Sequence, residues 1–179
     1  ARNSIAMYEL CKREGRGLNC RFLAQVLSEM YLAMGFPSRF VTCQSKAYDT
    51  DTDCHVINMV WSRQLGKWIW MDASFAAYVT DENGLLLHPG EVRERLIKGL
   101  PLVLNEDANW NHKTKQTKEG YLENYMAKNL YMLDAHLESR FETEPADGSG
   151  SPRMYLVPEG FWPLSGHTTY DDRYFWQAP

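Results

Sequence analysis

The chain has 179 residues, of which 44% are hydrophobic and 23% charged, and its formal net charge is −4. This length and composition predict one globular domain with a sizeable core. The acidic balance argues against a nucleic-acid partner, and no apolar run approaches the roughly 20 residues that span a membrane. The chain starts at Ala1 without a methionine or a signal-peptide pattern, so we expect a leader or an upstream segment to be missing.

Helical spacing of apolar residues predicts two helices in the first 40 residues, over 4–14 and 20–34. Asn19 is a good N-cap for the second helix, and Gly35 is a good stop. Cys20 then falls in the first helical turn. The side chains expected to face inward from the second helix are Leu23, Val26, Leu27, Met30, Tyr31 and Met34.

Strands follow. Residues 39–43 form a β-branched and aromatic run, and 44–53 is a polar, turn-rich loop. Two apolar runs, 54–61 and 68–75, are joined by a short linker with a glycine, which predicts an antiparallel hairpin. The rest of the chain predicts helices over 88–100 and 121–141, a linker over 142–152, a strand over 153–158 and a packed aromatic tail. This order predicts an α+β fold with an antiparallel sheet.

The hairpin brings a histidine near an aspartate. Antiparallel partners keep the sum of their residue numbers constant, and a sum of 127 places His55 directly opposite Asp72. A shift of two residues makes the pair diagonal on the same face, and a shift of one separates the two side chains. An aspartate beside a histidine can orient the imidazole and stabilise its charged form.

The four cysteines form no CxxC pair, which excludes the usual metal spacings, and they are too few for a disulfide scaffold. We expect Cys11, Cys43 and Cys54 to be packing residues. A zinc site built from Cys20, Cys43, Cys54 and His55 has no recognised spacing. Cys20 differs because the N-terminus of a helix stabilises a thiolate, and a nearby imidazolium would lower its pKa further.

The order of these motifs resembles that of the transglutaminase-like superfamily, a papain-related thiol fold with bacterial members. The matching stretches are GLNCRFLAQVLSEMYLAMGFPSRFVTC, DCHVINMVW and GKWIWMDASF, within residues 15–100. The resemblance implies Cys20 as nucleophile, His55 as general base and acid, and Asp72 as orienter. It also implies a nucleophile helix packed on an antiparallel sheet. We expect this core over 1–104 and a helical C-terminal extension, which the resemblance does not cover, over 105–179.

The expected activity is acyl transfer on amide or peptide bonds of a peptide or protein substrate, more hydrolytic than cross-linking, without a metal or an organic cofactor. Trp61 and Trp70 are candidates for lining a substrate groove, with core packing as the alternative. No Gln or Trp precedes Cys20 as the family's oxyanion-hole side chain would. A non-catalytic binding module with the same fold therefore stays the alternative function.

Overall fold

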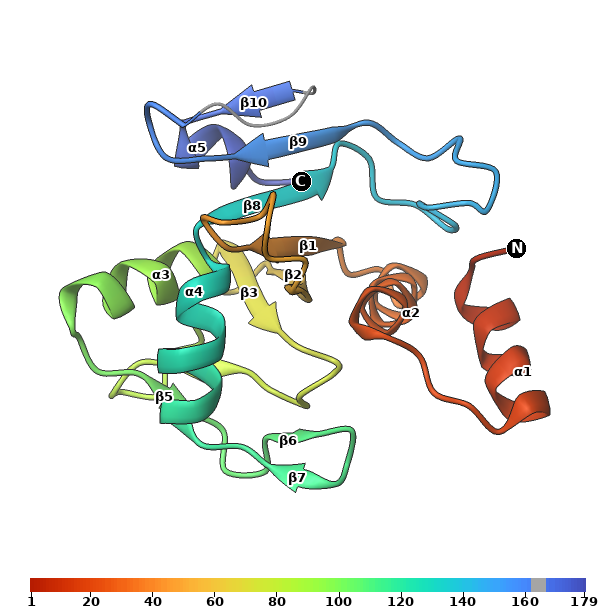
Figure 1. Ribbon diagram of the computed structural model, residues 1–179, viewed down its shortest axis with the longest axis horizontal. Helices are drawn as coiled ribbons and strands as arrows, with labels where there is room; N and C mark the ends of the chain where they lie inside the picture. Colours follow the sequence, from red (N-terminus) through yellow and green to blue (C-terminus); the bar gives the residue numbers. More distant parts are fainter. Residues whose placement is uncertain (162–166) are drawn as a thin grey trace.

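A six-stranded sheet in the order β10-β9-β8-β1-β2-β3 forms the centre of the protein (Figure 1). The computed structural model describes residues 1–161 and 167–179. Neighbouring strands are antiparallel except β9 and β10. The strands are β1 (Ser38–Gln44), β2 (Cys54–Ser62), β3 (Lys67–Met71), β8 (Met132–His136), β9 (Arg153–Leu156) and β10 (His167–Thr169).

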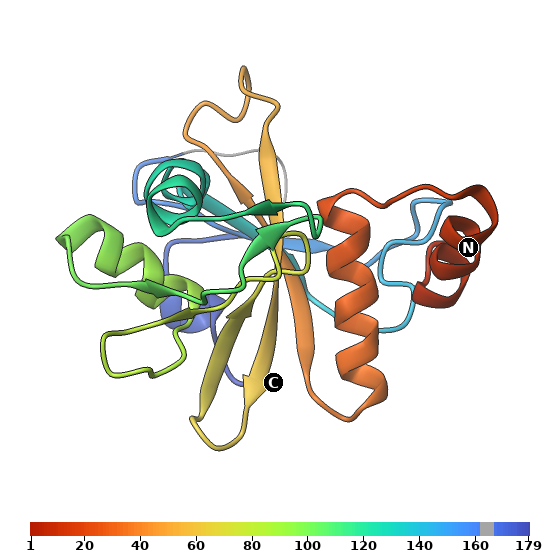
Figure 2. The ribbon, with the colours of Figure 1, turned by 90° about the horizontal axis from the view of Figure 1, so that it is seen from below.

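Helices cover both faces of this sheet (Figure 2). On one face lies α2 (Cys20–Ala33), with α1 (Ser4–Glu14) packed on its outer side. The other face carries α3 (Pro89–Lys98), the π-helix η1 (Glu119–Met126), α4 (Ala127–Asn129) and α5 (Asp172–Phe175). Two small strand pairs complete the fold, β4 (Val79–Thr80) with β5 (Val103–Leu104) and β6 (Asn109–Trp110) with β7 (Thr114–Lys115). The predicted α+β class is confirmed.

The main core lies between the sheet and the helices α3 and η1 that cover one of its faces. Side chains from alternate positions of the strands, such as Ile57, Met59 and Leu133, are fully buried there. The aromatic tail joins this core through Phe175, as predicted. In the described parts of the chain, no helix is long and apolar enough to cross a bilayer.

The helix predicted over 20–34 is confirmed, but its buried face is not the expected one. Met30 and Met34 are 53% and 61% exposed, whereas Gln25 and Glu29 are buried. The Glu29 carboxylate accepts backbone N–H groups of Ser4 (2.6 Å) and Glu142 (2.9 Å). Polar groups on α2 therefore fasten two other segments of the chain, which an apolar periodicity cannot reveal.

The single helix predicted over 121–141 is wrong in its second half. Helical structure ends at Asn129, and Met132–His136 forms β8 beside β1. Leu133 and Ala135 point to the main core while Asp134 and His136 point to the α2 face, which is strand alternation. The leucines of this stretch fit both periods, and sheet pairing decides between them.

Residues after 104 supply β8, β9 and β10 and thereby continue the sheet of β1–β3. This part contains more strand than the helical extension expected from the sequence, because half of the predicted helix forms β8 and pairs with β1, and the run after it forms β9 and pairs with β8. The domain boundary at residue 104 stays a prediction.

Candidate active site

Cys20 is the first residue of α2. The Asn19 side chain caps the helix by accepting the N–H of Phe22 at 3.0 Å, as its sequence position predicts. The Asn58 amide donates to the Ala24 carbonyl at 2.6 Å and so fixes α2 against β2. The backbone N–H groups of Arg21 and Val56 donate to the Cys20 sulfur. The thiol is thus held at the helix start and faces several donors.

His55 and Asp72 meet across the end of the hairpin. β2 and β3 pair with Met59 opposite Trp70, so the residue numbers of partners sum to 129 rather than 127. The pair is therefore diagonal, which is the shift of two residues that keeps both side chains on one face. The distance from His55 Nε2 to Asp72 Oδ2 is 2.6 Å, and the two side chains are 2% and 0% exposed.

The Asp72 carboxylate has four hydrogen-bond donors. Its Oδ1 accepts the backbone N–H groups of Ser74 (2.9 Å) and Phe75 (3.2 Å). Its Oδ2 accepts from His55 and from the Tyr121 hydroxyl at 2.5 Å. β3 ends at Met71, and a single bridge between Asp72 and Ala77 turns the chain so that these N–H groups face the carboxylate. A buried carboxylate with this many donors is held in one orientation.

The electrostatics favour a charged pair of Cys20 and His55. Burial opposes ionisation of Cys20, but the hydrogen bond and charge of His55, with the two backbone donors, lower the pKa of its thiol. Burial likewise opposes the charge on His55, but Asp72 and the hydrogen bond to Cys20 raise its pKa to about 9. Near neutral pH the arrangement stabilises a thiolate beside an imidazolium.

Two aromatic rings flank the His55 imidazole. Its centroid lies 5.3 Å from that of Phe75 and 5.5 Å from that of Tyr125, both edge to face, and Phe75 in turn stacks on Tyr121 at 4.6 Å. Tyr121 and Tyr125 come from η1, which the sequence analysis treated as part of an amphipathic helix. The only local signal was two tyrosines four residues apart, so sequence reasoning missed them.

The two tryptophans proposed for a substrate groove lie elsewhere. Trp70 is fully buried, and its Nε1–H donates to the Tyr121 hydroxyl at 3.3 Å, so a role in lining a groove does not fit this side chain. Trp61 packs edge to face on Trp68 and lines a hollow with Trp176. It is six residues along β2 from His55, or roughly 20 Å at the rise of a strand. Contact between Trp61 and a group reacting at Cys20 is not favoured.

The remaining cysteines differ from Cys20 in their surroundings. Cys43 is buried directly opposite His55 on β1, and burial raises its pKa well above the ordinary value. Cys54 is partly buried, and burial raises its pKa as well. Within residues 1–161 and 167–179, no cluster of three or more His, Cys, Asp or Glu is arranged for a metal ion, so the zinc alternative is not supported.

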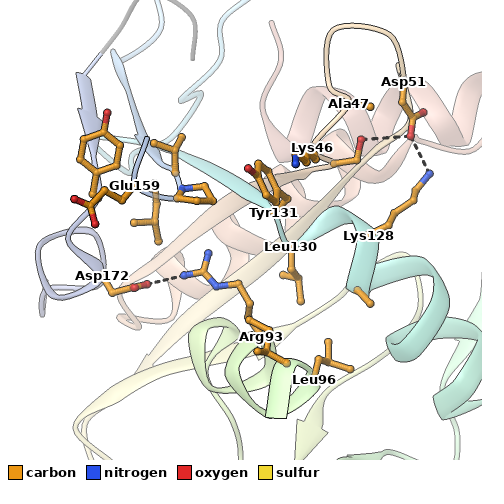
Figure 3. A pocket seen from close by; sticks show the side chains of 17 residues that line it. Lys46, Ala47, Asp51, Arg93, Leu96, Lys128, Leu130, Tyr131, Glu159 and Asp172 are labelled. Carbon is orange, nitrogen blue, oxygen red and sulfur yellow. Dashed lines mark hydrogen bonds and ion pairs between the residues drawn. The ribbon is translucent and has the colours of Figure 1, made fainter. Parts of the chain in front are cut away.

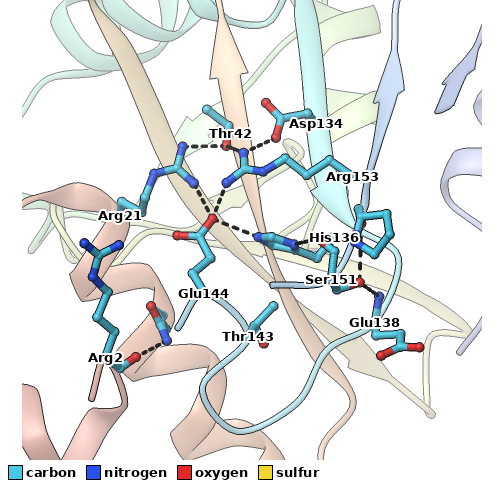
Figure 4. A network of polar contacts seen from close by, with 12 residues as sticks. Arg2, Arg21, Thr42, Asp134, His136, Glu138, Thr143, Glu144, Ser151 and Arg153 are labelled. Atoms are coloured by element: carbon cyan, nitrogen blue, oxygen red, sulfur yellow. Dashed lines mark hydrogen bonds and ion pairs between the residues drawn. The ribbon is translucent and has the colours of Figure 1, made fainter. Parts of the chain in front are cut away.

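A second polar cluster lies on the α2 face of the sheet (Figure 4). Glu144 Oε1 accepts from Arg21 Nη1 at 2.9 Å, from His136 Nε2 at 2.8 Å and from Arg153. Arg153 also pairs with Asp134 at 2.5 Å. This cluster fastens residues 142–152, which were predicted to be a linker, against the sheet. Its polar side chains had no partner pattern in the sequence.

A hollow of about 920 Å³ lies between the β1–β2 loop, α3, α4 and β9 (Figure 3). Leu96, Leu130 and Tyr131 contribute to its walls. Four of its flanking charges form ion pairs, Arg93 with Asp172 at 2.9 Å and Lys128 with Asp51 at 3.2 Å. Cys20, His55 and Asp72 do not line this hollow, so its shape gives no direct support to chemistry at the thiol.

The fold and the grouping of thiol, imidazole and carboxylate define a class, the papain-like α+β core with a cysteine at a helix start. Residues 3–73 match the family model described as the transglutaminase-like superfamily. Residues 3–73 are therefore similar to the core of that superfamily, which confirms the resemblance seen in the sequence over that segment. Comparisons with curated proteins and with solved structures found no match. The match ends one residue after Asp72, before η1 begins.

Proposed function

We propose that the protein is a thiol-dependent acyltransferase acting on amide or peptide bonds, with Cys20 as nucleophile, His55 as general acid and base, and Asp72 as the orienting group. The observation that carries the proposal is the buried His55–Asp72 pair at 2.6 Å, hydrogen-bonded in turn to a thiol at the start of a helix. Its support from the family is the transglutaminase-like match over residues 3–73.

In the first step the Cys20 thiolate attacks the carbonyl carbon, and a C–S bond forms. The backbone N–H of Cys20 at the start of α2 is suited to receive the negative charge on the carbonyl oxygen, since the N–H groups of Arg21 and Phe22 bond the thiol sulfur and the Asn19 side chain. His55 gives its proton to the leaving nitrogen, and the C–N bond breaks. The products are a thioester at Cys20, a free amine and a neutral imidazole.

In the second step neutral His55 takes a proton from the acceptor as the acceptor attacks the thioester. Attack by water breaks the C–S bond and releases a carboxylic acid, whereas attack by an amine releases a new amide. We favour water, because the resemblance points to peptidase-like members of the superfamily. Asp72 holds the imidazole through Nε2, which leaves Nδ1 for the exchange of protons at Cys20.

The experiment uses p-nitrophenyl acetate as a general acyl donor. The expected result is a rapid release of p-nitrophenol equal to the protein concentration, with the acetyl group on the tryptic peptide that contains Cys20. Adding n-butylamine distinguishes the acceptors, since transfer gives N-butylacetamide and hydrolysis gives acetate. Cys20→Ser should abolish the rapid phase.

The matched control is a second thiol in the same protein. Cys54→Ser should leave the rapid phase intact, because burial raises the pKa of Cys54 and no base activates it. A wild-type protein that shows no rapid phase, or that acetylates Cys54 as readily as Cys20, would contradict the proposal and favour a non-catalytic binding module.

A further inference from the structure

Tyr121 is fully buried, and its hydroxyl lies 2.5 Å from Asp72 Oδ2, the same oxygen that accepts from His55. It belongs to η1, a stretch of π-helix that lies outside the segment matched by the family. π-Helical turns are rare and occur frequently at functional sites. The position of Tyr121 therefore calls for more than a packing explanation.

The direction of the Tyr121 hydrogen bond is fixed by its neighbours. The indole N–H of Trp70 can only donate, and it donates to the Tyr121 oxygen at 3.3 Å. The single hydroxyl proton of Tyr121 is then directed at Asp72. Burial, together with the Asp72 charge, raises the pKa of Tyr121 well above its ordinary value, so the proton stays on the tyrosine throughout the working pH range.

We propose that Tyr121 is a positioning residue for the Cys20–His55–Asp72 site. The hydrogen bond from its hydroxyl partly offsets the negative charge of Asp72 and thereby sets the pH at which His55 releases its proton. This inference rests on the proposed function. A donor to a carboxylate lowers its affinity for protons, and the effect extends to the imidazole paired with it. Without the hydroxyl, the His55–Asp72 pair holds its proton to higher pH.

Two other titratable groups that face the pair stay neutral over this range, while Asp53 nearby is held in an ion pair with Lys128 at 2.8 Å. Cys43 from β1 and Tyr125 from η1 face the site, and burial raises the pKa of both. Asp53 and Cys54, just before His55, lie near Tyr125 and Cys20 respectively. Changes between neutral pH and pH 10 therefore report mainly on His55, whose pKa is raised to about 9.

The experiment measures the rate of Cys20 alkylation by iodoacetamide against pH in the full chain. Mass spectrometry of tryptic peptides separates Cys20, in residues 17–21, from Cys54, in residues 47–63. In the wild type we expect thiolate reactivity below the pH at which an ordinary thiol ionises, and a second inflection near pH 9, where His55 loses its proton. In Tyr121→Phe we expect that second inflection to move upward by about one pH unit.

Tyr131→Phe is the matched control, because Tyr131 lies in the distant hollow beside Phe161 and contacts none of the three site residues. It should keep the wild-type profile. A Tyr121→Phe protein with a lower melting temperature but an unchanged second inflection would show a structural role only and overturn the inference, while leaving the proposed function intact. A wild-type Cys20 with an ordinary thiol profile would overturn both.

If Tyr121→Phe does not fold, NMR of the wild type provides the test. A hydroxyl proton directed at a buried carboxylate should exchange slowly with water, appear far downfield and show cross-peaks to the His55 ring. A Tyr121 hydroxyl proton that exchanges freely at neutral pH would overturn the inference.

Discussion

The described part of the chain contains two carboxylate–histidine pairs, one on each face of the same sheet. The Asp72 carboxylate accepts a hydrogen bond from His55 at 2.6 Å on the core face. The Glu144 carboxylate accepts one from His136 at 2.8 Å on the α2 face. Glu144 also accepts from two arginines, whereas Asp72 accepts otherwise only from a tyrosine hydroxyl and two backbone N–H groups.

That difference separates a structural cluster from a chemical one. Two guanidinium groups neutralise Glu144, so little of its charge is left for the imidazole beside it. Among the described residues, Asp72 forms an ion pair only with His55, and its charge acts on that imidazole. Under the function that we propose, the same pair of residue types serves stability in one place and proton transfer in another.

The largest effect is expected from Asp72→Asn. The amide keeps the shape of the carboxylate but loses its charge, so His55 is no longer held or stabilised in its protonated form. We expect acetyl transfer from p-nitrophenyl acetate to fall by about 10²–10⁴-fold. Glu144→Gln is the matched change at the other pair, and a loss there as large as at Asp72 would contradict the division of roles.

Glu144→Gln should instead reduce stability. Removing its charge leaves Arg21 and Arg153 in a partly buried site without their shared carboxylate. We expect the free energy of unfolding to fall by about 2–3 kcal/mol, measured by urea denaturation. Glu94→Gln is the control, because Glu94 pairs with Lys98 on the surface and should leave the urea midpoint unchanged. Equal midpoints for the two variants would be evidence against the cluster as an anchor.

The two pairs should also lose their contributions to the free energy of unfolding at opposite ends of the pH scale. Burial opposes ionisation of Glu144, but His136 and the two arginines lower its pKa to about 2. Its contribution is therefore present above about pH 4.3 and is lost as the pH falls through about 2. Melting curves should show this acid loss in the wild type and a smaller one in Glu144→Gln; identical acid limbs would contradict the assignment.

The contribution of His55 to folding stability has the opposite pH dependence. Because its pKa is raised to about 9, its contribution is present below about pH 6.5 and is lost as the pH rises through about 9. The alkaline limb of the melting curve should accordingly be shallower in His55→Gln than in the wild type. Parallel alkaline limbs would show that His55 is not stabilised by Asp72.

The smallest effect concerns the helix cap. Asn19→Ala removes the acceptor of the Phe22 N–H and should cost about 1 kcal/mol of folding free energy. Alkylation of Cys20 should slow only a few-fold, since His55 remains beside the thiol. Asn19→Ser, which restores an acceptor, should recover both values, and its failure to do so would argue against the capping role.

Local patterns were enough to predict α2 with its Asn19 cap, the hairpin and the face shared by His55 and Asp72. The exact register was left open because turn chemistry alone did not choose between sums of 127 and 129. Tyr121 could not be predicted, since it reaches Asp72 from 49 residues away through a π-helix. The strand at Met132–His136 was missed because its leucines also fit a helix and only pairing with β1 decides.

An NMR titration of the histidine rings measures directly whether Asp72 stabilises the protonated imidazole of His55. The chain has five histidines, and the His55→Gln spectrum identifies the resonance of interest. We expect the His55 ring to titrate with a midpoint near 9. His88, whose pKa burial lowers to about 4, should stay neutral from pH 6 upward. A His55 midpoint at or below the ordinary value of about 6.5 would show that Asp72 does not stabilise the protonated imidazole.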